Sequence, residues 1–311
     1  MTTALLLDSV FKEHAPGPGH PECPERYDAV TAALSHHTDL PRIPLRSATA
    51  DELALCHTRR YIAQAEREIR SGLTELTTGD TNVGLKSYDV AIEAVGSVLN
   101  AVDWVMEGKV SNAFCAVRPP GHHASNARGM GFCVFNNIAV AARYAQQRFG
   151  VERVMIADWD VHHGNGTQDI FYQDGSVFFF STHQSPWYPG TGAHSERGEG
   201  KGEGSTLNLP LPAGSGRPEV LGGFQERLLA EAKSFRPDLV LISAGFDSRL
   251  GDPLGQFRLT DPDFADLTRV MLEIAATYAG GRLVSLLEGG YSLTGLAAGV
   301  ASHVDALKGI R

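Results

Sequence analysis

Short apolar runs bounded by polar or turn residues recur along the chain. They lie at 4–8, 113–117, 153–158, 177–181, 239–245 and 282–290, and a shorter run, TLNL, lies inside the Gly-rich segment 197–216. Continuous apolarity over several residues is typical of strands that are covered on both faces. Segments with helical spacing separate these runs, at 86–107, 136–149, 218–234, 260–279 and 293–308. The pattern predicts an α/β fold with a mainly parallel, multi-stranded sheet and helices on both faces.

Length and composition fit a single globular domain over residues 1–311, because large α/β sheets often reach this size as one unit. The net charge of -9 and the lack of a Lys/Arg cluster argue against nucleic acid as a partner. The four cysteines form no CxxC pair, so neither a disulfide framework nor a thiolate metal site is indicated. No apolar run approaches the ~20 residues of a membrane span. We therefore expect a cytoplasmic protein that does not act at a membrane.

Segments rich in acidic residues, histidines and glycines follow five of the predicted strands. The segments are RPPGHH, DWDVHHGNG, STHQSPWYPGTG, FDSRLGDPLG and EGGYS. Ligands of parallel α/β sheets bind at the carboxyl ends of the strands, where these loops gather. The sequence therefore predicts one site at this edge of the sheet.

A metal site is predicted from the segment DWDVHH. Asp160 and His162 are two positions apart at the end of a strand, so their side chains point to the same face. Asp247 follows a second strand and would add a third ligand, which leaves room for water as in catalytic metal sites. For Asp160 alone a structural role is an equal alternative, and the joint pattern favours a site. Zinc is preferred, although this donor set does not choose sharply among Zn, Fe(II), Mn and Co.

Two imidazoles on the RPPGHHA loop are candidates for proton transfer. His122 and His123 beside a metal-bound water could remove its proton and return it to a leaving amine. Each ring needs an acceptor on its other nitrogen, and Asp158 and Asn165 are the expected ones. In LEGGYS, a tight glycine turn could bring the phenol of Tyr291 close to the metal, where it would polarise a carbonyl.

Segments from both halves of the chain resemble the metal-dependent histone deacetylase superfamily, which includes bacterial deacetylase-like amidohydrolases and acetylpolyamine amidohydrolases. They are GHPECPERY, RPPGHHA, GMGFCVFNN, DWDVHHGNGTQ, YPGTG, SAGFDSRLGDPLG and LEGGYS. The resemblance covers nearly the whole chain. Asn165 and the LEGGY segment are similar to the class II branch. The resemblance implies the single-domain arginase/deacetylase-like fold.

The resemblance also implies a role for each residue of the site. The three predicted ligands would hold one catalytic Zn2+ per chain. His123 would be the general base and acid, His122 its electrostatic partner, and Tyr291 the group that polarises the carbonyl. Asp158 and Asn165 would orient the two histidines, and His163 is expected to be structural.

A narrow acyl-lysine tunnel and a potassium site are implied by the same resemblance. The matching tunnel positions are Gly131, Phe132, Tyr188 and Leu254, with Arg26 near an inner cavity through which acetate leaves. A structural K+ site would use Asp158, Asp160, His162, Ser181 and the carbonyl of Thr182, and a second one would use Phe171 and its neighbours.

Two positions depart from the family pattern. Tyr188 stands where a phenylalanine is often found, which adds a hydroxyl at the tunnel wall. Leu254 is apolar where a polyamine-specific member carries an acidic residue, which favours acyl-lysine over acetylpolyamine as the substrate.

The leading hypothesis is a zinc-dependent deacetylase that removes acetyl or similar short acyl groups from lysine side chains of proteins or peptides. An acetylpolyamine deacetylase is the alternative within the same chemistry. A ureohydrolase of the arginase kind would need a two-metal carboxylate cluster that DWDVHH does not reproduce. A catalytically silent acyl-binding or scaffold protein is the alternative from another class. The sequence leaves open whether the chain forms a homo-oligomer.

Overall fold

Seven parallel strands form one sheet in the computed structural model, which describes residues 2–309. The strands are β1 Thr3–Leu6, β2 Asn112–Cys115, β3 Val154–Asp158, β4 Val177–Gln184, β5 Thr206–Leu211, β6 Leu239–Ala244 and β7 Leu283–Leu287. Their order across the sheet is β1-β2-β7-β6-β3-β4-β5. All six neighbouring pairs are parallel, and each predicted apolar run supplies one strand.

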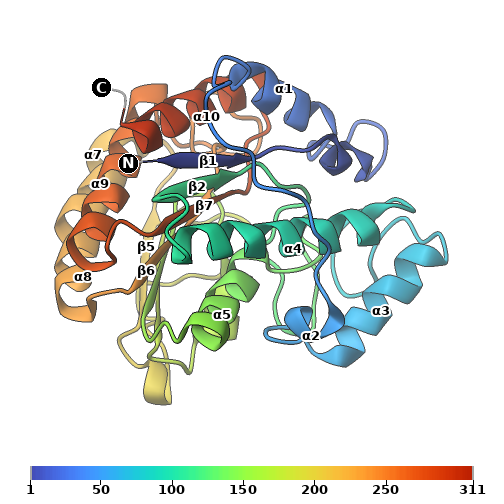
Figure 1. Cartoon of the computed structure of the whole chain (residues 1–311), viewed down its shortest axis with the longest axis horizontal. Coiled ribbons are helices and arrows are strands. Elements are labelled where there is room, and N and C mark those ends of the chain that lie inside the picture. The colour runs from blue at the N-terminus through green and yellow to red at the C-terminus, as the bar shows by residue number, and fades with distance from the viewer. Residues whose placement is uncertain (1, 310–311) are drawn as a thin grey trace.

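Helices cover both faces of the sheet, as predicted. They are α1 Glu25–Ala33, α2 Ala50–Leu53, α3 Arg59–Arg70, α4 Ser87–Met106, α5 Asn137–Phe149, α6 Asn165–Phe171, α7 Arg217–Gly222, α8 Leu229–Phe235, α9 Asp261–Tyr278 and α10 Leu293–Lys308. Two short 3-10 turns, Ser9–Glu13 and Gly200–Gly202, and a π-helical stretch, Gly223–Leu228, complete the elements. Figure 1 places α4 and α5 on one side of the sheet and α1 and α10 on the other. No helix among residues 2–309 is long and apolar enough to cross a membrane.

The strands are apolar on both faces because each face is covered by its own core. In β3, Val154 and Ile156 pack into the core under α4 and α5. Met155 and Ala157 point to the opposite face, into the core under α9 and α10. Two buried faces explain why the strand sequences are continuous apolar runs rather than alternating ones.

The strand order brings the predicted site segments together. β2, β7, β6 and β3 are consecutive across the sheet, although the chain visits them in a different order. Because all four strands are parallel, their carboxyl ends lie at one edge. The loops that follow them therefore converge, as expected at a topological switch point of an α/β sheet.

The N-terminal helices were not predicted from the sequence. α1 buries Arg26 and Tyr27 beside Val30, so its inner face carries a cation and a phenol where an apolar stripe would be expected. α3 is rich in charged residues, and its buried side includes Glu68. On α1 the polar inner face weakens the apolar periodicity that identifies a helix, whereas α3 carries a clear apolar stripe at helical spacing that the prediction overlooked.

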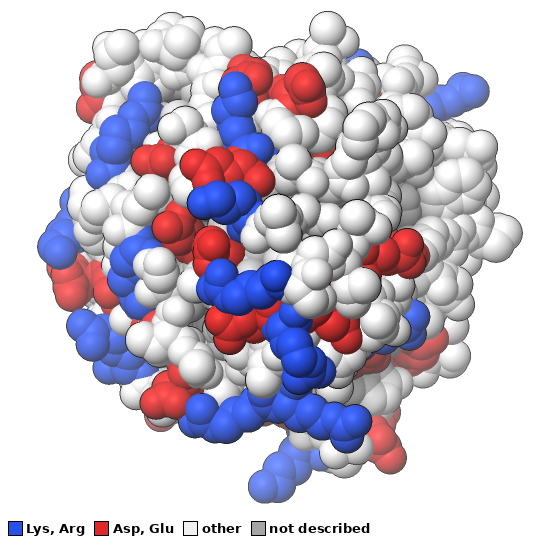
Figure 2. All heavy atoms as spheres, turned by 90° about the vertical axis from the view of Figure 1, so that its right-hand side faces the viewer, with Lys and Arg blue, Asp and Glu red and all other residues white. Residues whose placement is uncertain are grey.

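Acidic and basic side chains are mixed over the face drawn in Figure 2. Arg70 at the end of α3 makes two such pairs: its Nε lies 3.0 Å from Glu66 Oε1, and its Nη2 lies 2.9 Å from Asp89 Oδ1 on α4. These groups are about half exposed, and such surface pairs contribute little to stability. The mixed charges give this face no single sign of potential.

The contact between the ends of β6 and β3 depends on Gly245. A Cβ atom at this position would overlap the main chain and side chain of Asp160. We expect Gly245→Ala to lower the free energy of unfolding by about 1–3 kcal/mol, because the two strand ends would be forced apart. Gly222→Ala is the matched control, since no atom lies within 4 Å of its added Cβ.

Urea unfolding of both variants, measured on metal-free protein, checks this expectation. Gly222→Ala should be neutral or slightly stabilising, because alanine restricts the unfolded chain more than glycine does. Equal unfolding midpoints for the two variants would contradict the close approach of the strand ends.

Candidate active site

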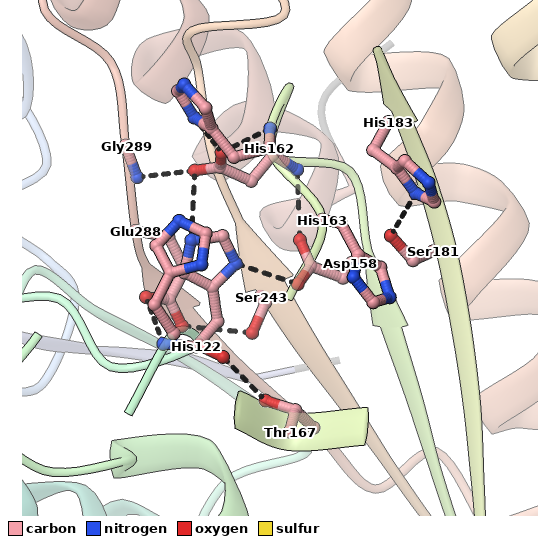
Figure 3. A network of polar contacts seen from close by, with 12 residues as sticks. His122, Asp158, His162, His163, Thr167, Ser181, His183, Ser243, Glu288 and Gly289 are labelled. Carbon is pink, nitrogen blue, oxygen red and sulfur yellow. Dashed lines mark hydrogen bonds and ion pairs between the residues drawn. The ribbon is translucent and has the colours of Figure 1, made fainter. Parts of the chain in front are cut away.

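The carboxyl ends of four neighbouring strands surround one group of buried polar side chains (Figure 3). β3 ends at Asp158, and Asp160 and His162 follow it. Asp247 follows β6, and Glu288 follows β7 directly. The loop after β2 adds the histidine pair of RPPGHHA. Positions far apart in the sequence thus meet in one place, as the strand-end prediction required.

The three predicted metal ligands, which we call the trio, lie together. One ligand atom each from Asp160, His162 and Asp247 fall within 4.8 Å of one another. His162 Nδ1 is 2.9 Å from Asp160 Oδ1 and 3.2 Å from Asp247 Oδ2. All three side chains are buried. This is an open three-ligand set, the arrangement that catalytic metal sites use.

The chemistry of the trio fits a cation. Asp247 Oδ2 is buried and makes no hydrogen bond among the described residues. Burial and the nearby Asp160 carboxylate raise the pKa of Asp247, because two buried negative charges repel. A divalent ion between the carboxylates would bind the Asp247 oxygen that has no hydrogen bond, and it would offset the repulsion between the two negative charges. The site also needs Gly289, because a Cβ atom there would overlap Asp247 Oδ2.

The two histidines are oriented as the sequence analysis expected. His122 Nδ1 lies 2.9 Å from Asp158 Oδ2, and His123 Nδ1 lies 2.8 Å from Asn165 Oδ1. Asn165 is the first residue of α6, so a helix end fixes this acceptor. The two ring centroids are 4.0 Å apart. With Nδ1–H donated to Asn165, the Nε2 of His123 is left as an acceptor.

The different partners give the two imidazoles different charges. Burial lowers the pKa of His122, but the Asp158 and Asp160 carboxylates outweigh it and raise this pKa to about 10. Burial and the neighbouring His122 lower the pKa of His123 well below its usual value. A charged imidazole therefore lies beside a neutral one, and His123 is the one able to accept a proton near pH 7.

Glu288 joins the site although the sequence analysis used only the glycines and the tyrosine of LEGGYS. Its Oε2 accepts hydrogen bonds from the backbone N–H of Gly121 (2.7 Å) and of His122 (3.2 Å). Its Oε1 accepts from Ser243 Oγ at 2.9 Å. Glu288 thus ties the histidine loop to β6 (Figure 3). A carboxylate directly after a buried strand was the signal that could have identified it.

His163 points away from the trio, as expected for a structural residue. Its ring lies 2.8 Å from Thr191 Oγ1 and 3.0 Å from Gln168 Oε1. Both ring nitrogens are therefore occupied by side chains outside the trio. Burial lowers the pKa of His163 well below its usual value, so it packs as a neutral side chain.

The residues proposed for potassium are close in the fold. Ser181 lies beside Asp158 across the β3–β4 pair, and Thr182 follows it, fully buried. Ser181 Oγ is 2.9 Å from His183 Nδ1. Phe171, implied for a second site, is the buried last residue of α6. Potassium binding at both places stays a prediction.

A cavity of about 260 Å³ reaches His162 of the trio and His123. Its walls contain all four predicted tunnel residues, together with two residues that were not predicted. The lining is Asp80, His123, Gly131, Phe132, His162, Trp187, Tyr188, Leu254 and Tyr291. The Phe132 and Tyr291 rings meet edge to face with centroids 5.9 Å apart, and Tyr188 stands edge-on to His123 at 5.2 Å.

Asp80 and Trp187 organise the mouth of this cavity. Asp80 Oδ1 accepts from the Gly131 N–H at 2.8 Å and from the Tyr188 hydroxyl at 3.2 Å. Trp187 Nε1 donates to the carbonyl oxygen of Leu254 at 2.9 Å. These three hydrogen bonds join loops that are far apart in the sequence, so no local pattern marked Asp80 or Trp187.

Arg26 lies behind Tyr291 and is not part of the cavity wall. It is fully buried, and its Cζ is 5.0 Å from the Tyr291 ring centroid. Its Nε donates to the Gly290 carbonyl at 2.7 Å, and Nη2 donates to the Glu288 carbonyl at 2.6 Å. On the other side, Asp252 Oδ2 accepts from the Tyr291 N–H at 2.7 Å. The backbone that presents the phenol is thus held from both sides.

Comparison with known proteins agrees with this geometry. Residues 20–307 match the histone deacetylase domain. The rice protein Histone deacetylase 10, chloroplastic, is 43% identical over 93% of this chain and 70% of its own length. The mouse Polyamine deacetylase HDAC10 is 41% identical over 93% of this chain and 45% of its own length.

A solved structure has the same fold as this chain. The crystal structure of the HDA15 HD domain superposes with a TM-score of 0.93 at 37% identity, and the match covers 99% of this chain and 88% of that one. The domain match spans nearly the whole chain, and the predicted arginase/deacetylase-like fold is confirmed. The chain belongs to the histone deacetylase family.

Proposed function

We propose that this chain is a zinc-dependent amidohydrolase that removes acetyl or similar short acyl groups from lysine side chains of proteins or peptides. One observation carries the proposal: a single cavity is lined by His162 of the metal-ligand trio, by the neutral His123 and by the phenol of Tyr291. The rings of Phe132 and Tyr188 line its walls. Apolar walls suit the methylene groups of a lysine side chain, and the polar groups at the inner end suit its amide.

The metal ligands, His123 and Tyr291 have different roles in hydrolysis of the amide. Zn2+ held by Asp160, His162 and Asp247 would supply a Lewis acid that polarises the amide carbonyl and activates water. His123 Nε2 accepts the proton of the attacking water and returns it to the leaving amine. Tyr291 donates its phenolic proton in a hydrogen bond to the carbonyl oxygen as negative charge develops there.

The surroundings keep these groups in the required protonation states. Burial raises the pKa of Tyr291 well above its usual value, so the phenol stays a donor. His122, charged through its Asp158 partner, adds a positive charge beside the reacting centre. Zinc is preferred over Fe(II), although two carboxylates and one imidazole accept both ions.

Hydrolysis of an acetyl-lysine peptide by the zinc-loaded chain is the expected result. Tyr291→Phe should lower kcat by about 10²- to 10³-fold, because it removes one donor to the developing oxyanion. Tyr278→Phe, at the end of α9 and outside the cavity, is the matched control and should leave kcat unchanged. Acetate release measures both rates. The proposal fails if zinc-loaded protein leaves the peptide intact.

The same assay separates the alternatives. Leu254 places an apolar side chain in the cavity wall, so acetyl-lysine peptide should be turned over faster than acetylspermidine or acetylputrescine. The reverse order would make the chain a polyamine deacetylase. Binding of a hydroxamate without turnover of any acylated amine would instead indicate a silent acyl-binding protein.

Glu288 is expected to act by positioning the histidine loop. Glu288→Ala removes the acceptor for the Gly121 and His122 N–H groups, so kcat should fall by about 10- to 100-fold through misplacement of the imidazoles. Glu288→Gln is the matched variant, because an amide oxygen can accept these bonds while its NH2 group donates to Ser243. Near-normal kcat in Glu288→Gln, with a normal circular dichroism spectrum for both variants, is the expected outcome. Equal losses in the two variants would show that the charge matters.

Tyr188 is expected to influence the choice of acyl group. Its hydroxyl bonds to Asp80, which restrains the ring that stands against His123. Tyr188→Phe removes a bond worth about 1 kcal/mol, so the ratio of kcat/KM for butyryl-lysine over acetyl-lysine should rise about fivefold. Asp80→Asn retains an acceptor oxygen and serves as the control. An unchanged ratio in Tyr188→Phe would contradict a role for this bond in selectivity.

A further inference from the structure

A second cluster of ligand-type side chains lies away from the cavity, where the end of α1 meets the end of α10. His36 and His37 follow α1 by a few residues, and Asp305 lies in the last turn of α10. One ligand atom from each falls within 4.8 Å of the others. Figure 1 shows α1 and α10 side by side at the top of the molecule. The two clusters, this one and the active-site trio, are the groups of this kind within residues 2–309.

We propose that His36, His37 and Asp305 form a second metal site, which takes a borderline divalent cation such as Zn2+ and joins the end of α1 to α10. None of these residues lines the catalytic cavity. The site would therefore hold its ion independently of the catalytic one.

Two atoms of the cluster are buried and make no hydrogen bond, although the Asp305 side chain as a whole is 37% exposed. His37 is 1% exposed, and neither its Nε2 nor Asp305 Oδ1 makes a hydrogen bond among the described residues. The two atoms nevertheless lie 3.2 Å apart. A buried nitrogen and a buried carboxylate oxygen that make no hydrogen bond are costly, and a shared cation would satisfy both.

The 3.2 Å separation suits two ligands of one ion. Nitrogen and oxygen atoms that bind Zn2+ at about 2.0–2.1 Å in tetrahedral geometry lie about 3.3 Å from each other. The active-site trio shows the same two features. His162 Nδ1 and Asp247 Oδ2 are also 3.2 Å apart, and Asp247 Oδ2 also makes no hydrogen bond. Each of the two clusters thus places a histidine nitrogen and a carboxylate oxygen at a separation that two ligands of one ion have, with a third ligand atom nearby.

The third ligand and the nearby charges complete the site. The His36 ring is exposed and lies against the His37 ring, with centroids 4.0 Å apart. The neighbouring Lys308 ammonium is paired with Asp39, at 2.8 Å from Oδ2, so its charge is already balanced. Two imidazoles and one carboxylate favour Zn2+, Cu2+ or Ni2+ over Mg2+ or Ca2+. The exposed side at His36 leaves a coordination position open to water.

Metal counting on tag-free, full-length protein tests the proposal. Chelator-stripped chain is dialysed against Zn2+, and bound metal is measured by elemental analysis. Two ions per chain are expected for the wild type and one for His36→Ala or Asp305→Asn, with deacetylase activity unchanged in both. Thr38→Ala, an exposed neighbour without a ligand, is the matched control and should keep two.

Blocking the catalytic site makes the result independent of the proposed activity. His162→Ala should still bind one Zn2+ and should melt about 5 °C higher at a Zn2+ concentration near 100 Kd. Adding Asp305→Asn should abolish both the bound ion and the shift in melting temperature. One ion in the wild type, none in His162→Ala, or two retained in His36→Ala and Asp305→Asn, would overturn the second site whether or not the chain deacetylates lysine.

Discussion

Repulsion between the buried carboxylates of Asp160 and Asp247 is the constraint around which the active site is built. Each carboxylate is fixed by a backbone N–H from another loop: Gly289 N–H donates to Asp160 Oδ2, and Val161 N–H donates to Asp247 Oδ1. Those donors stabilise the negative charges but leave Asp247 Oδ2 unpaired. A cation bound between the carboxylates would balance these charges. Holding the two acids this close requires three neighbouring strands, β3, β6 and β7, to end at the same level of the sheet.

Buried negative charge also sets the protonation states of the two active-site histidines. The Asp158 and Asp160 carboxylates keep His122 protonated, and the charged His122 in turn helps to keep His123 neutral. Around this centre a second set of buried charges holds the loops. Glu22 accepts from Arg118 Nε at 2.6 Å and from Arg26 Nη1 at 2.8 Å, and all three residues are fully buried. Through Arg118 and Arg26 it links the segment before α1 to the histidine loop and to the turn that presents the Tyr291 phenol.

The placement of the site was predictable because it depends on local chemistry at strand ends. A D-x-H pair after one apolar run, an aspartate after another and two histidines after a third required only that parallel strands end together. Asp80, Trp187 and Asp252 were missed because each acts through a bond to a loop at least 39 positions away, and nothing in its own neighbourhood marks that partner. Glu288 also bonds to a distant loop, but its place directly after a buried strand was a local signal that was overlooked. Helix α1 was missed because Arg26 and Tyr27 interrupt its apolar face, whereas α3 has an apolar stripe at helical spacing that was overlooked.

The sequence by itself determined the sheet, the two-sided helix cover and the residue types that a hydrolytic metal site needs, because apolar runs and strand-end polar groups are local features. Only the tertiary structure decided the strand order, which places β2, β7, β6 and β3 side by side. It also placed Arg26 behind Tyr291, and it brought His36 and His37 to Asp305 across more than 260 positions. These outcomes depend on packing between distant segments, where burial makes each unpaired polar atom costly.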